Sequence, residues 1–542
     1  MEQGSADAQI VKVGTTSFRP GPRLRYFCYA MLILVLVIFA AIRIRLRNTP
    51  LQRDEGEYAY AGQLLLQGIP PYKLAYNMKL PGTYVAYAAM MAAFGETVPG
   101  IRIGMLVVLV ANTLLLFFLT RRLFGLLTAT AAAAFYTLLA NRWSTLSLDG
   151  HATHFIVLAA LAGTLLLSRA VETQSKVILW SSGICFGLAF LMKQQGLTYA
   201  VFAGLFWIGS EWRRSANWRR LLSGLCVLAS GLSIPYLFTC LVAGYAGVFH
   251  QFWFWTVRYG AAYEKIVNWS EGWKNFNINW PSVPHPAIIW WMAGFGLTAL
   301  FWNRRGREHN VLILSFAFFS ILAVMPGLYF RQHYFLVLLP VVAMLAGLAI
   351  GAPYESLEGR GRISMLRCLP IVVFLVAYFS GLIGQKKYFV RMTPLQISRQ
   401  MYPEDGFAES RVVGDYIRDH TSDHDRIAVL ASEPEIYFYS HRHSATGYLY
   451  MYPLMEKQKF AHRMQQEMIH EVEQSEPEMI VFTDNMFTWG CKPKWPEVSP
   501  EPSMDMFVWM HHYLDAHYRQ MVEVPAYSRA GSSCSYFVYR LR

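Results

Sequence analysis

Charged residues are scarce in this chain of 542 residues: only 15% are Asp, Glu, Lys or Arg, whereas soluble domains carry about 25%. Cysteine is scarce as well, and seven cysteines at this length exclude a disulfide-rich scaffold. Hydrophobic residues, in contrast, make up 54% of the chain, and 31 Tyr, 35 Phe and 16 Trp are present. This composition excludes disorder and collagen-like fibres. It predicts a polytopic membrane protein with a soluble part attached.

Eleven apolar segments are candidates for membrane-spanning helices, because a helix needs about 20 mostly apolar residues to cross the hydrocarbon core. They cover residues 26–42, 101–119, 123–140, 154–167, 177–191, 197–208, 221–242, 287–302, 311–324, 335–350 and 368–383. The first segment has no small-x-small cleavage site and is not a cleaved signal peptide. After residue 385 no long apolar run remains. We therefore expect an α-helical protein with about eleven spans.

Basic residues gather in alternate loops between these segments. They are Arg121, Arg122, Arg213, Arg214, Arg219, Arg220, Arg304, Arg305, Arg307, Arg360, Arg362 and Arg367. Because cytoplasmic loops carry the excess of Lys and Arg, residues 1–25 are predicted to be a cytoplasmic tail and the segment after residue 385 to lie outside. Residues 81–94 are too short for a span, and a crossing there would invert every later loop. We expect them to form an interfacial or re-entrant helix on the outer face.

The segment from residue 385 to 542 has the pattern of a small α/β domain. Strands are predicted at 426–431 and 479–483, helices at 412–419 and 456–472, and a last edge strand at 536–540. Cys491 and Cys534 lie in this domain and could pair, although their spacing alone does not show it. The predicted organisation is a tail (1–25), a membrane module (26–384) and an outer α/β domain (385–542).

An acidic pair, Asp54 and Glu55, stands just outside the first predicted span. Ionised carboxylates beside the low dielectric of a membrane cost free energy, and such residues are therefore candidates for a functional site. Asp54 could accept a proton from an incoming hydroxyl or amine, with Glu55 holding the geometry. The alternative is structural, because acidic residues ahead of residues 58–67 would also stabilise the N-terminus of a helix.

Cations recur at comparable depth on the predicted outer face. Lys79 follows the acidic pair in the same loop, Lys193 ends one span, and Arg331 with His333 precedes another. A single lysine at this depth is more often an interfacial residue than a ligand. Three cations that meet one acidic pair would form a site for a phospholipid phosphate and a nucleophile.

The motifs of these loops resemble a known family when they are taken in order. DEGEYAYAGQLLLQGIPPY and NMKLPGTY are followed by RLFG, LDGH, MKQQG and RQHYF. This ordered set is similar to the polyprenyl-phosphate-dependent glycosyltransferases with the GT-C fold. More narrowly, it resembles glycosyltransferase family 39, with its aminoarabinose transferases and protein mannosyltransferases. The resemblance covers most of the membrane region and implies a GT-C-like catalytic module.

The resemblance also implies roles for individual residues. Asp54 would be the catalytic base beside Glu55, Asp149 would be the family's second acidic position, and Lys79, Lys193, Arg331 and His333 would bind the donor phosphate. In the aminoarabinose transferases a glutamate before the Lys-Pro element helps to bind a metal, and Met78 stands there instead. Asp54, Asp149 and His151 offer other ligands, although histidines near a loop are more often hydrogen-bonded surface groups. No metal ligand is assigned, and a divalent metal stays open as a cofactor.

The expected activity is the transfer of a sugar from a polyprenyl-phosphate donor to an acceptor outside the cytoplasmic membrane, in a single inverting displacement. The expected partners are the lipid-linked sugar, a lipid, glycan or protein acceptor, and the membrane, but no nucleic acid. The sequence contains no P-loop and no GxGxxG between a strand and a helix, so a nucleotide pocket is not expected. The alternative is a transporter or flippase of lipid-linked sugars, which would place charged or broken helices at mid-membrane.

Overall fold

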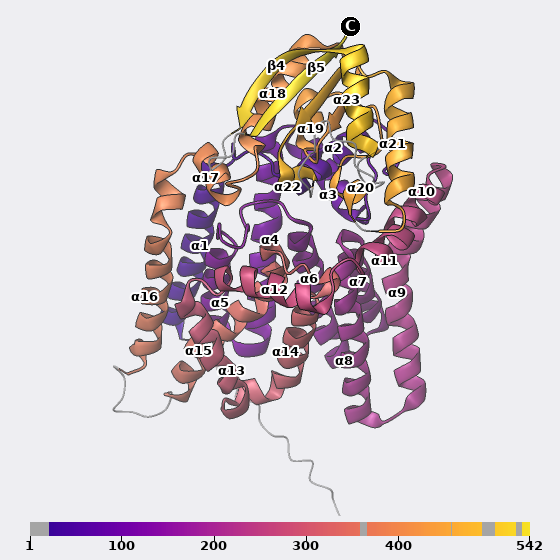
Figure 1. Ribbon diagram of the computed structural model, residues 1–542. Coiled ribbons are helices and arrows are strands. Elements are labelled where there is room, and N and C mark those ends of the chain that lie inside the picture. Colours follow the sequence, from indigo (N-terminus) through magenta and orange to yellow (C-terminus); the bar gives the residue numbers. More distant parts are fainter. Residues whose placement is uncertain (1–20, 358–365, 457, 490–504, 527–533) are drawn as a thin grey trace, which may run out of the picture.

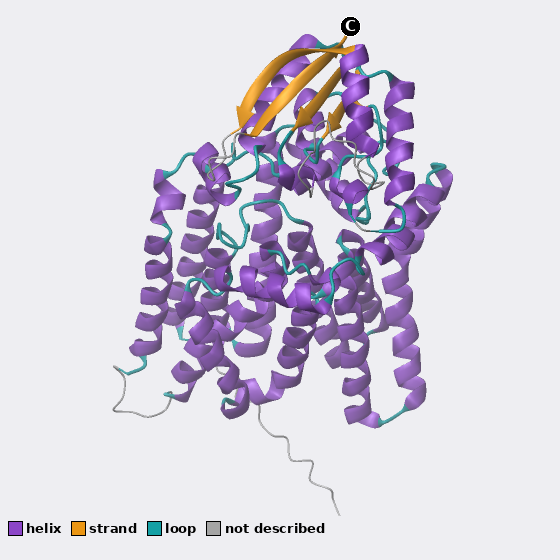
Figure 2. Cartoon of the chain, in the orientation of Figure 1, coloured by secondary structure: helices purple, strands orange, loops and turns teal. Residues whose placement is uncertain are grey.

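The computed structural model describes residues 21–357, 366–456, 458–489, 505–526 and 534–542. Figure 1 shows a bundle of helices with a small sheet at one end. Figure 2 shows that the strands gather at that end and that the rest of the bundle is helical. This arrangement confirms an α-helical membrane protein with a C-terminal α/β part.

Each of the eleven predicted spans coincides with a helix. These are α1 (Pro22–Arg45), α4 (Val98–Phe124), α5 (Leu126–Leu139), α6 (Ala152–Thr173), α7 (Lys176–Met192), α8 (Leu197–Ser215), α9 (Trp218–Tyr245), α13 (Ala287–Trp302), α14 (Arg304–Leu322), α15 (Leu339–Ser356, preceded by the 3-10 helix η5, Gln332–Leu338) and α16 (Cys368–Gly384). Among the described residues, five segments are long and apolar enough to cross a membrane alone: α1, α4, α6, α9 and the continuous η5–α15. Shorter apolar helices, including α5, α7, α13 and α16, accompany them. The chain is therefore a multi-pass membrane protein.

Small residues allow the central helices to approach closely. Every residue of α5 is buried, as are the first 14 residues of α15. A Cβ placed on Gly347 would lie 2.5 Å from the carbonyl oxygen of Thr128, and one placed on Gly296 would lie 1.8 Å from that of Leu345. Because lipid chains are as apolar as the helices, such close backbone contact drives their association in membranes.

Two short helices follow α1 at the end that carries the sheet (Figure 1): α2 (Arg53–Leu66) and α3 (Gly82–Phe94). Residues 81–94 were predicted as a short helix, and α3 has 13 residues. A Cβ on Gly82 would lie 2.6 Å from the carbonyl oxygen of Leu191, so α3 rests directly on the end of α7. Its depth in the membrane stays a prediction.

The described residues form a sheet of five strands in the order β2–β1–β3–β5–β4. They are β1 (Arg426–Leu430), β2 (His443–Ser444), β3 (Met479–Thr483), β4 (Tyr518–Ala526) and β5 (Cys534–Leu541), accompanied by α17 (Pro394–Met401), α18 (Phe407–His420), α21 (Ala461–Ser475) and α23 (Asp505–His517). Strand β1 runs parallel to β2 and β3, whereas β5 is antiparallel to β3 and β4.

The prediction that residues 536–540 form an edge strand is wrong, because β5 lies between β3 and β4 and the edge belongs to β4. Most of β4 is exposed or half-buried, and it contains Pro525, so its sequence does not show the apolar pattern of an inner strand. Cys491, Arg360, Arg362 and the first 20 residues lie outside the described residues. A bond between Cys491 and Cys534 and the boundaries of the predicted domains stay predictions.

The sheet unit, which we define as residues 394–542, rests on α2 and its following loop. The short helix α19 (Glu435–Ser440) contacts α2 so closely that a Cβ on Gly56 would lie 2.5 Å from the backbone nitrogen of Glu435. The rings of Tyr60 and Tyr437 stack with centroids 5.1 Å apart. Tyr76 and Tyr448 form an isolated parallel bridge. The first loop of the membrane part is therefore covered by the sheet unit.

Candidate active site

The acidic pair lies in the first turn of α2. Gln52 caps this helix: its side chain accepts a hydrogen bond from the backbone N–H of Asp54 at 2.8 Å, and Glu55 completes a capping box. The acidic pair therefore does begin a helix, as the structural interpretation predicts. The pair can still take part in a functional site, because consecutive side chains of a helix point about 100° apart and the two carboxylates enter different surroundings.

Asp54 joins a cluster of charged side chains. The Lys79 ammonium lies 2.8 Å from Asp54 Oδ1 and 2.5 Å from Glu57 Oε2. His333 Nε2 lies 3.9 Å from Asp54 Oδ2. Glu57 is fully buried and also accepts hydrogen bonds from Tyr84 at 2.5 Å and Tyr450 at 2.6 Å. One ammonium is therefore shared by two carboxylates, and its geometry is fixed by neighbouring tyrosines.

The two other predicted cations lie near the same carboxylate. Lys193 Nζ stands 3.8 Å from the centre of the Tyr334 ring, and the Arg331 guanidinium 5.4 Å from that of Tyr329. Neither makes an ion pair with a carboxylate of the described segments. Burial raises the pKa of Asp54, but the charges around it, led by Lys79 and including Arg331, outweigh burial, and the pKa lies well below its usual value. Asp54 is therefore ionised at neutral pH.

Glu55 and Asp149 face away from this cluster and meet at Arg102. The Arg102 guanidinium donates to both oxygens of the fully buried Glu55, at 2.9 Å from Nη2 to Oε2. Asp149 Oδ1 lies 3.6 Å from Arg102 Nη2, and its Oδ2 accepts a hydrogen bond from Tyr402 at 2.7 Å. Of the three carboxylates predicted to be catalytic, the structure places only Asp54 among the predicted cations. Through Arg102, Glu55 and Asp149 connect the loop between α5 and α6 to α2.

Arg43, near the end of α1, was missed by the sequence analysis. Its buried guanidinium donates four hydrogen bonds, to Asn141 Oδ1 at 2.7 Å and to the carbonyl oxygens of Ala140, Ser147 and Leu148 at 2.6–2.7 Å. These groups belong to the loop that carries Asp149 and His151. In the sequence Arg43 is one of several arginines after an apolar run, and nothing distinguishes it from a loop cation.

His151 and His333 stack face to face, with ring centres 4.0 Å apart and planes inclined by 4°. The prediction that histidines here are hydrogen-bonded surface groups is wrong for His151. Only 2% of its surface is exposed, and neither ring nitrogen has a hydrogen-bond partner. Burial lowers the pKa of His151 to about 3, so its imidazole is neutral and keeps a free lone pair.

Asp54, His151 and His333 together offer a donor set for a metal. Their ligand atoms all lie within 4.8 Å of one another. One carboxylate and two neutral imidazoles suit zinc or a similar divalent metal, and the unpartnered nitrogens of His151 fit this role. Met78, at the position where the resemblance implies a metal-binding glutamate, offers no oxygen ligand.

Aromatic side chains from three segments flank the cluster. A cleft is lined by Tyr76 and Met78 of the first loop, by Trp255, Tyr259 and Tyr263 of the segment between α9 and α13, and by Tyr448, Tyr450 and Tyr452 of the sheet unit. Trp269 and Trp273 of the segment between α9 and α13 are exposed instead, at 72% and 66%. The tryptophans of this segment are thus divided between the cleft and the surface.

The sequence pattern of the family described as dolichyl-phosphate-mannose-protein mannosyltransferase matches residues 79–238. This part contains Lys79, Asp149 and Lys193. A search of curated proteins finds no match.

Solved structures with a similar fold include ArnT from Cupriavidus metallidurans bound to undecaprenyl phosphate. The two chains are 15% identical over 96% of this chain and 98% of that chain, with a TM-score of 0.55. The Archaeoglobus fulgidus oligosaccharyltransferase tethered with an acceptor peptide is 13% identical over 96% of this chain and 74% of that chain, with a TM-score of 0.53. The GT-C fold predicted from the motifs is thereby confirmed, and residues 79–238 match the sequence pattern of a family of glycosyltransferases.

Proposed function

We propose that the chain transfers a sugar from a polyprenyl-phosphate donor to an acceptor, with Asp54 as the general base. The observation that carries this proposal is the convergence on Asp54 of cations from three separate segments: Lys79 in ion-pair contact, and Lys193 and Arg331 through their charges. A carboxylate beside several cations suits a reaction in which a hydroxyl loses a proton while a phosphate leaves.

Lys193 and Arg331 are the better candidates for the donor phosphate. Lys79 already contacts both Asp54 and Glu57, so its charge is largely compensated. The other two cations have aromatic neighbours but no carboxylate partner among the described residues. The planar guanidinium of Arg331 can bind two phosphate oxygens through two parallel N–H groups of fixed geometry, whereas a lysine ammonium acts as a point charge.

The reaction is a single displacement at the anomeric carbon. The acceptor oxygen forms a bond to this carbon, while the bond from the carbon to the phosphate oxygen breaks. Asp54 takes the proton of the acceptor, and the polyprenyl phosphate leaves with its negative charge stabilised by Lys193 and Arg331. Because attack and departure occur on opposite faces, the anomeric configuration is inverted. A divalent metal held by Asp54, His151 and His333 would add positive charge at this place.

We infer that the sheet end faces the outside of the cytoplasmic membrane. A cavity at the opposite end of the bundle gathers Arg25, Arg121, Arg122 and Arg305, and the cytoplasmic side is the one that carries excess arginine and lysine. In this assignment residues 1–25 form a cytoplasmic tail, residues 26–384 the catalytic module, and residues 385–542 a periplasmic domain. α16, the last predicted span, ends at Gly384.

The test is a transfer assay with the full chain in proteoliposomes and a panel of radiolabelled polyprenyl-phosphate sugars and lipid, glycan and peptide acceptors. Asp54→Asn should lower the transfer rate by roughly 10²–10⁴-fold, the usual contribution of a general base. Asp149→Asn is the matched control, because this carboxylate binds Arg102 and Tyr402 instead. Transfer that is unaffected by Asp54→Asn would remove the base. Translocation of the lipid-linked sugar without any transfer would favour the flippase.

A further inference from the structure

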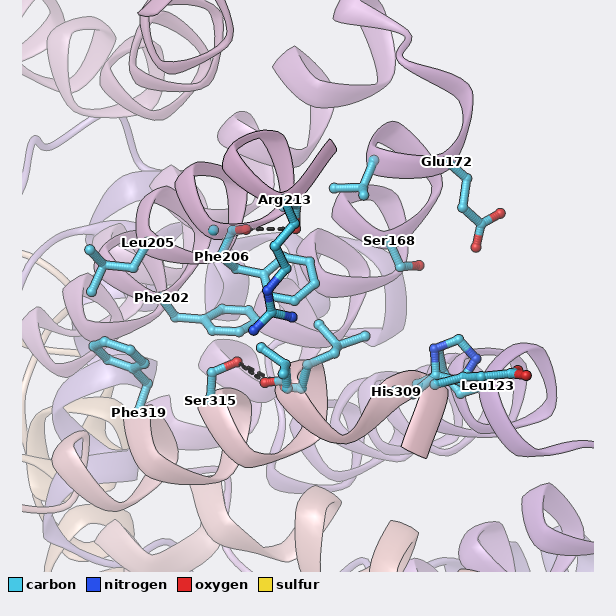
Figure 3. A pocket seen from close by; sticks show the side chains of 16 residues that line it. Leu123, Ser168, Glu172, Phe202, Leu205, Phe206, Arg213, His309, Ser315 and Phe319 are labelled. Atoms are coloured by element: carbon cyan, nitrogen blue, oxygen red, sulfur yellow. Dashed lines mark hydrogen bonds between the residues drawn. The ribbon is translucent and has the colours of Figure 1, made fainter. Parts of the chain in front are cut away.

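A second place in the molecule has the form of a ligand site, far from Asp54. A cavity of about 520 Å³ opens between α6, α8 and α14, with the end of α4 closing one side. Figure 3 shows its lining: Phe202, Phe206 and Phe319 lie together on one side, and Glu172, His309 and Leu123 lie on the other. Figure 1 shows that α8 ends and α14 begins at the end of the bundle opposite the sheet.

The depth of this cavity is close to that of one membrane leaflet. Along α8 the lining extends from Phe202 to Arg213, and along α14 from Glu308 to Phe319. At 1.5 Å per residue these two stretches are each about 15 Å long. Half of a hydrocarbon core of about 30 Å has the same length. The cavity therefore reaches from the end of the helices to about the middle of the bilayer.

The character of the lining changes along this depth. The part near the middle of the helices is formed by the phenylalanines, whereas the part near the helix ends carries the charged and polar residues Arg213, His309, Glu172 and Glu308. In Figure 3 the guanidinium of Arg213 extends into the cavity, toward Ser315 and away from Glu172. Arg213 makes no ion pair among the residues that the structure describes. Gly209 also lines the cavity, and a Cβ placed on it would meet nothing within 4 Å.

A basic cavity adjoins the first one. It has a volume of about 660 Å³ and shares the lining residues Leu123, Glu308 and His309. It adds four arginines: Arg25, Arg121, Arg122 and Arg305. Arg122 and Arg305 are paired with Glu172 and Glu355, whereas Arg121 lies against the ring of Tyr29 and makes no ion pair with a described carboxylate. The shared rim therefore carries positive charge that carboxylates do not fully compensate.

We propose that these two cavities form a binding site for an anionic phospholipid of the leaflet opposite the proposed active site. The phosphate lies among Arg213, Arg121 and Arg122, and one acyl chain fills the slot between α8 and α14. Basic pockets between membrane helices are suited to such head groups, and the apolar slot supplies the hydrophobic part of the affinity. Membrane topology alone requires cations at this end, but it requires neither a cavity of leaflet depth nor an arginine that extends into it. This site does not rest on the proposed transferase reaction.

The experiment measures the thermal unfolding of the full chain in detergent, with phosphatidylglycerol or phosphatidylcholine added. Phosphatidylglycerol should raise the unfolding temperature of the wild type at lower lipid concentration than phosphatidylcholine does, because a ligand of the folded state shifts unfolding by mass action. Gly209→Leu fills the slot and should weaken this response at least tenfold. Gly204→Leu is the matched control: it lies on the same helix, its Cβ also meets nothing within 4 Å, and it does not line the cavity.

Arg213→Gln keeps the slot and removes the head-group partner. Since Arg213 is exposed at the end of α8, this variant is expected to fold. It should lose the preference for phosphatidylglycerol and keep the response to phosphatidylcholine. Equal responses of the wild type to the two lipids would overturn the proposal. Equal responses of the Gly209→Leu and Gly204→Leu variants to phosphatidylglycerol would overturn it as well. If Gly209→Leu does not fold, the test rests on Arg213→Gln, and an unchanged preference for phosphatidylglycerol in that variant would overturn the proposal.

Discussion

The Lys79 ammonium lies 2.5 Å from Glu57 Oε2, in a place where the glutamate is fully buried. Removal of the lysine would leave Glu57 without its counter-charge, which costs about 3–5 kcal/mol for a buried pair. We expect Lys79→Met to lower the unfolding temperature measurably and to abolish transfer. Lys73→Met is the control, because Lys73 is an exposed cation of the same loop. Equal stability of the two variants would show that Glu57 does not depend on Lys79.

We expect the two cations without a carboxylate partner among the described residues to bind the donor phosphate. Loss of one hydrogen bond to a charged group costs about 1.5–3 kcal/mol, so Lys193→Gln and Arg331→Gln should each raise the KM for the lipid-linked donor roughly 10–100-fold. The KM for the acceptor should change little. Arg258→Gln, an exposed cation in the segment between α9 and α13, is the control. A rise confined to the acceptor KM would place the phosphate elsewhere.

Arg43 should be essential for the loop that carries His151. Arg43→Leu would leave the amide oxygen of Asn141 and three buried carbonyl oxygens without their donor. Each unsatisfied buried group costs about 1–3 kcal/mol, so we expect a strong loss of stability in a thermal unfolding assay. Arg47→Leu should have little effect, because Arg47 is exposed and its guanidinium donates a hydrogen bond to the carbonyl oxygen of Ile44, in the last turn of α1. Two variants of similar stability would contradict this role.

Stability should depend on pH through Glu433 and Glu435, which are buried beneath the sheet beside Arg53 and Asp405. Burial raises the pKa of Glu433 from 4.5 to about 7. Burial and the charge of Glu433 raise that of Glu435 further. The folded state therefore binds more protons than the unfolded state above about pH 4.5, so stability falls as the pH rises toward 7 and beyond.

The measurement is the unfolding temperature between pH 5 and pH 8. Glu435→Gln keeps the shape of the side chain without its charge. It should flatten the fall seen in the wild type and raise stability most at the alkaline end. Asp419→Asn, an exposed carboxylate of α18, should leave the slope unchanged. The same slope in the wild type and in Glu435→Gln would disprove this assignment.

Zinc or manganese should bind at Asp54, His151 and His333, whose ligand atoms lie within 4.8 Å of one another. We expect addition of the metal to the metal-free chain to raise its unfolding temperature, and bound metal to be detectable by elemental analysis. His333→Ala should abolish both effects. His285→Ala, an exposed histidine, should retain them. Metal retained by His333→Ala would show that it binds elsewhere.

The spans could be predicted from the sequence because a bilayer requires long apolar segments whose backbone groups are satisfied internally. The strands β1 and β3 are also visible, since they are continuous apolar runs that are buried on both faces. Strand β4 is not, because Arg519, Gln520, Glu523 and Pro525 interrupt its apolar residues and it pairs along one side alone in the described sheet. Patterns of apolar residues thus identify buried elements and miss the edge of the sheet.

The site was predictable only in part. Asp54 and the three cations share a depth relative to the predicted spans, and this depth is the pattern that groups them. In the structure Lys79 forms an ion pair with Asp54. The contact between His333 and Asp54 joins residues 279 positions apart, and that between Tyr402 and Asp149 joins residues 253 positions apart. Such pairs follow from packing of the whole chain, and local spacing carries no sign of them. For the same reason no local pattern separates Glu57, which pairs with Lys79, from the other acidic residues of its loop.

The hydroxyl of Tyr450 donates to Glu57 Oε2 at 2.6 Å, and its ring lies 5.5 Å from the Lys79 ammonium. The sheet unit therefore forms one side of the cluster around Lys79, and the cluster is incomplete without it. A shortened chain that keeps all its membrane helices would expose Glu57 and Lys79 to water and loosen both. Chimeras between relatives should be joined so that the segment with Tyr450 and the helix with Glu57 come from the same parent.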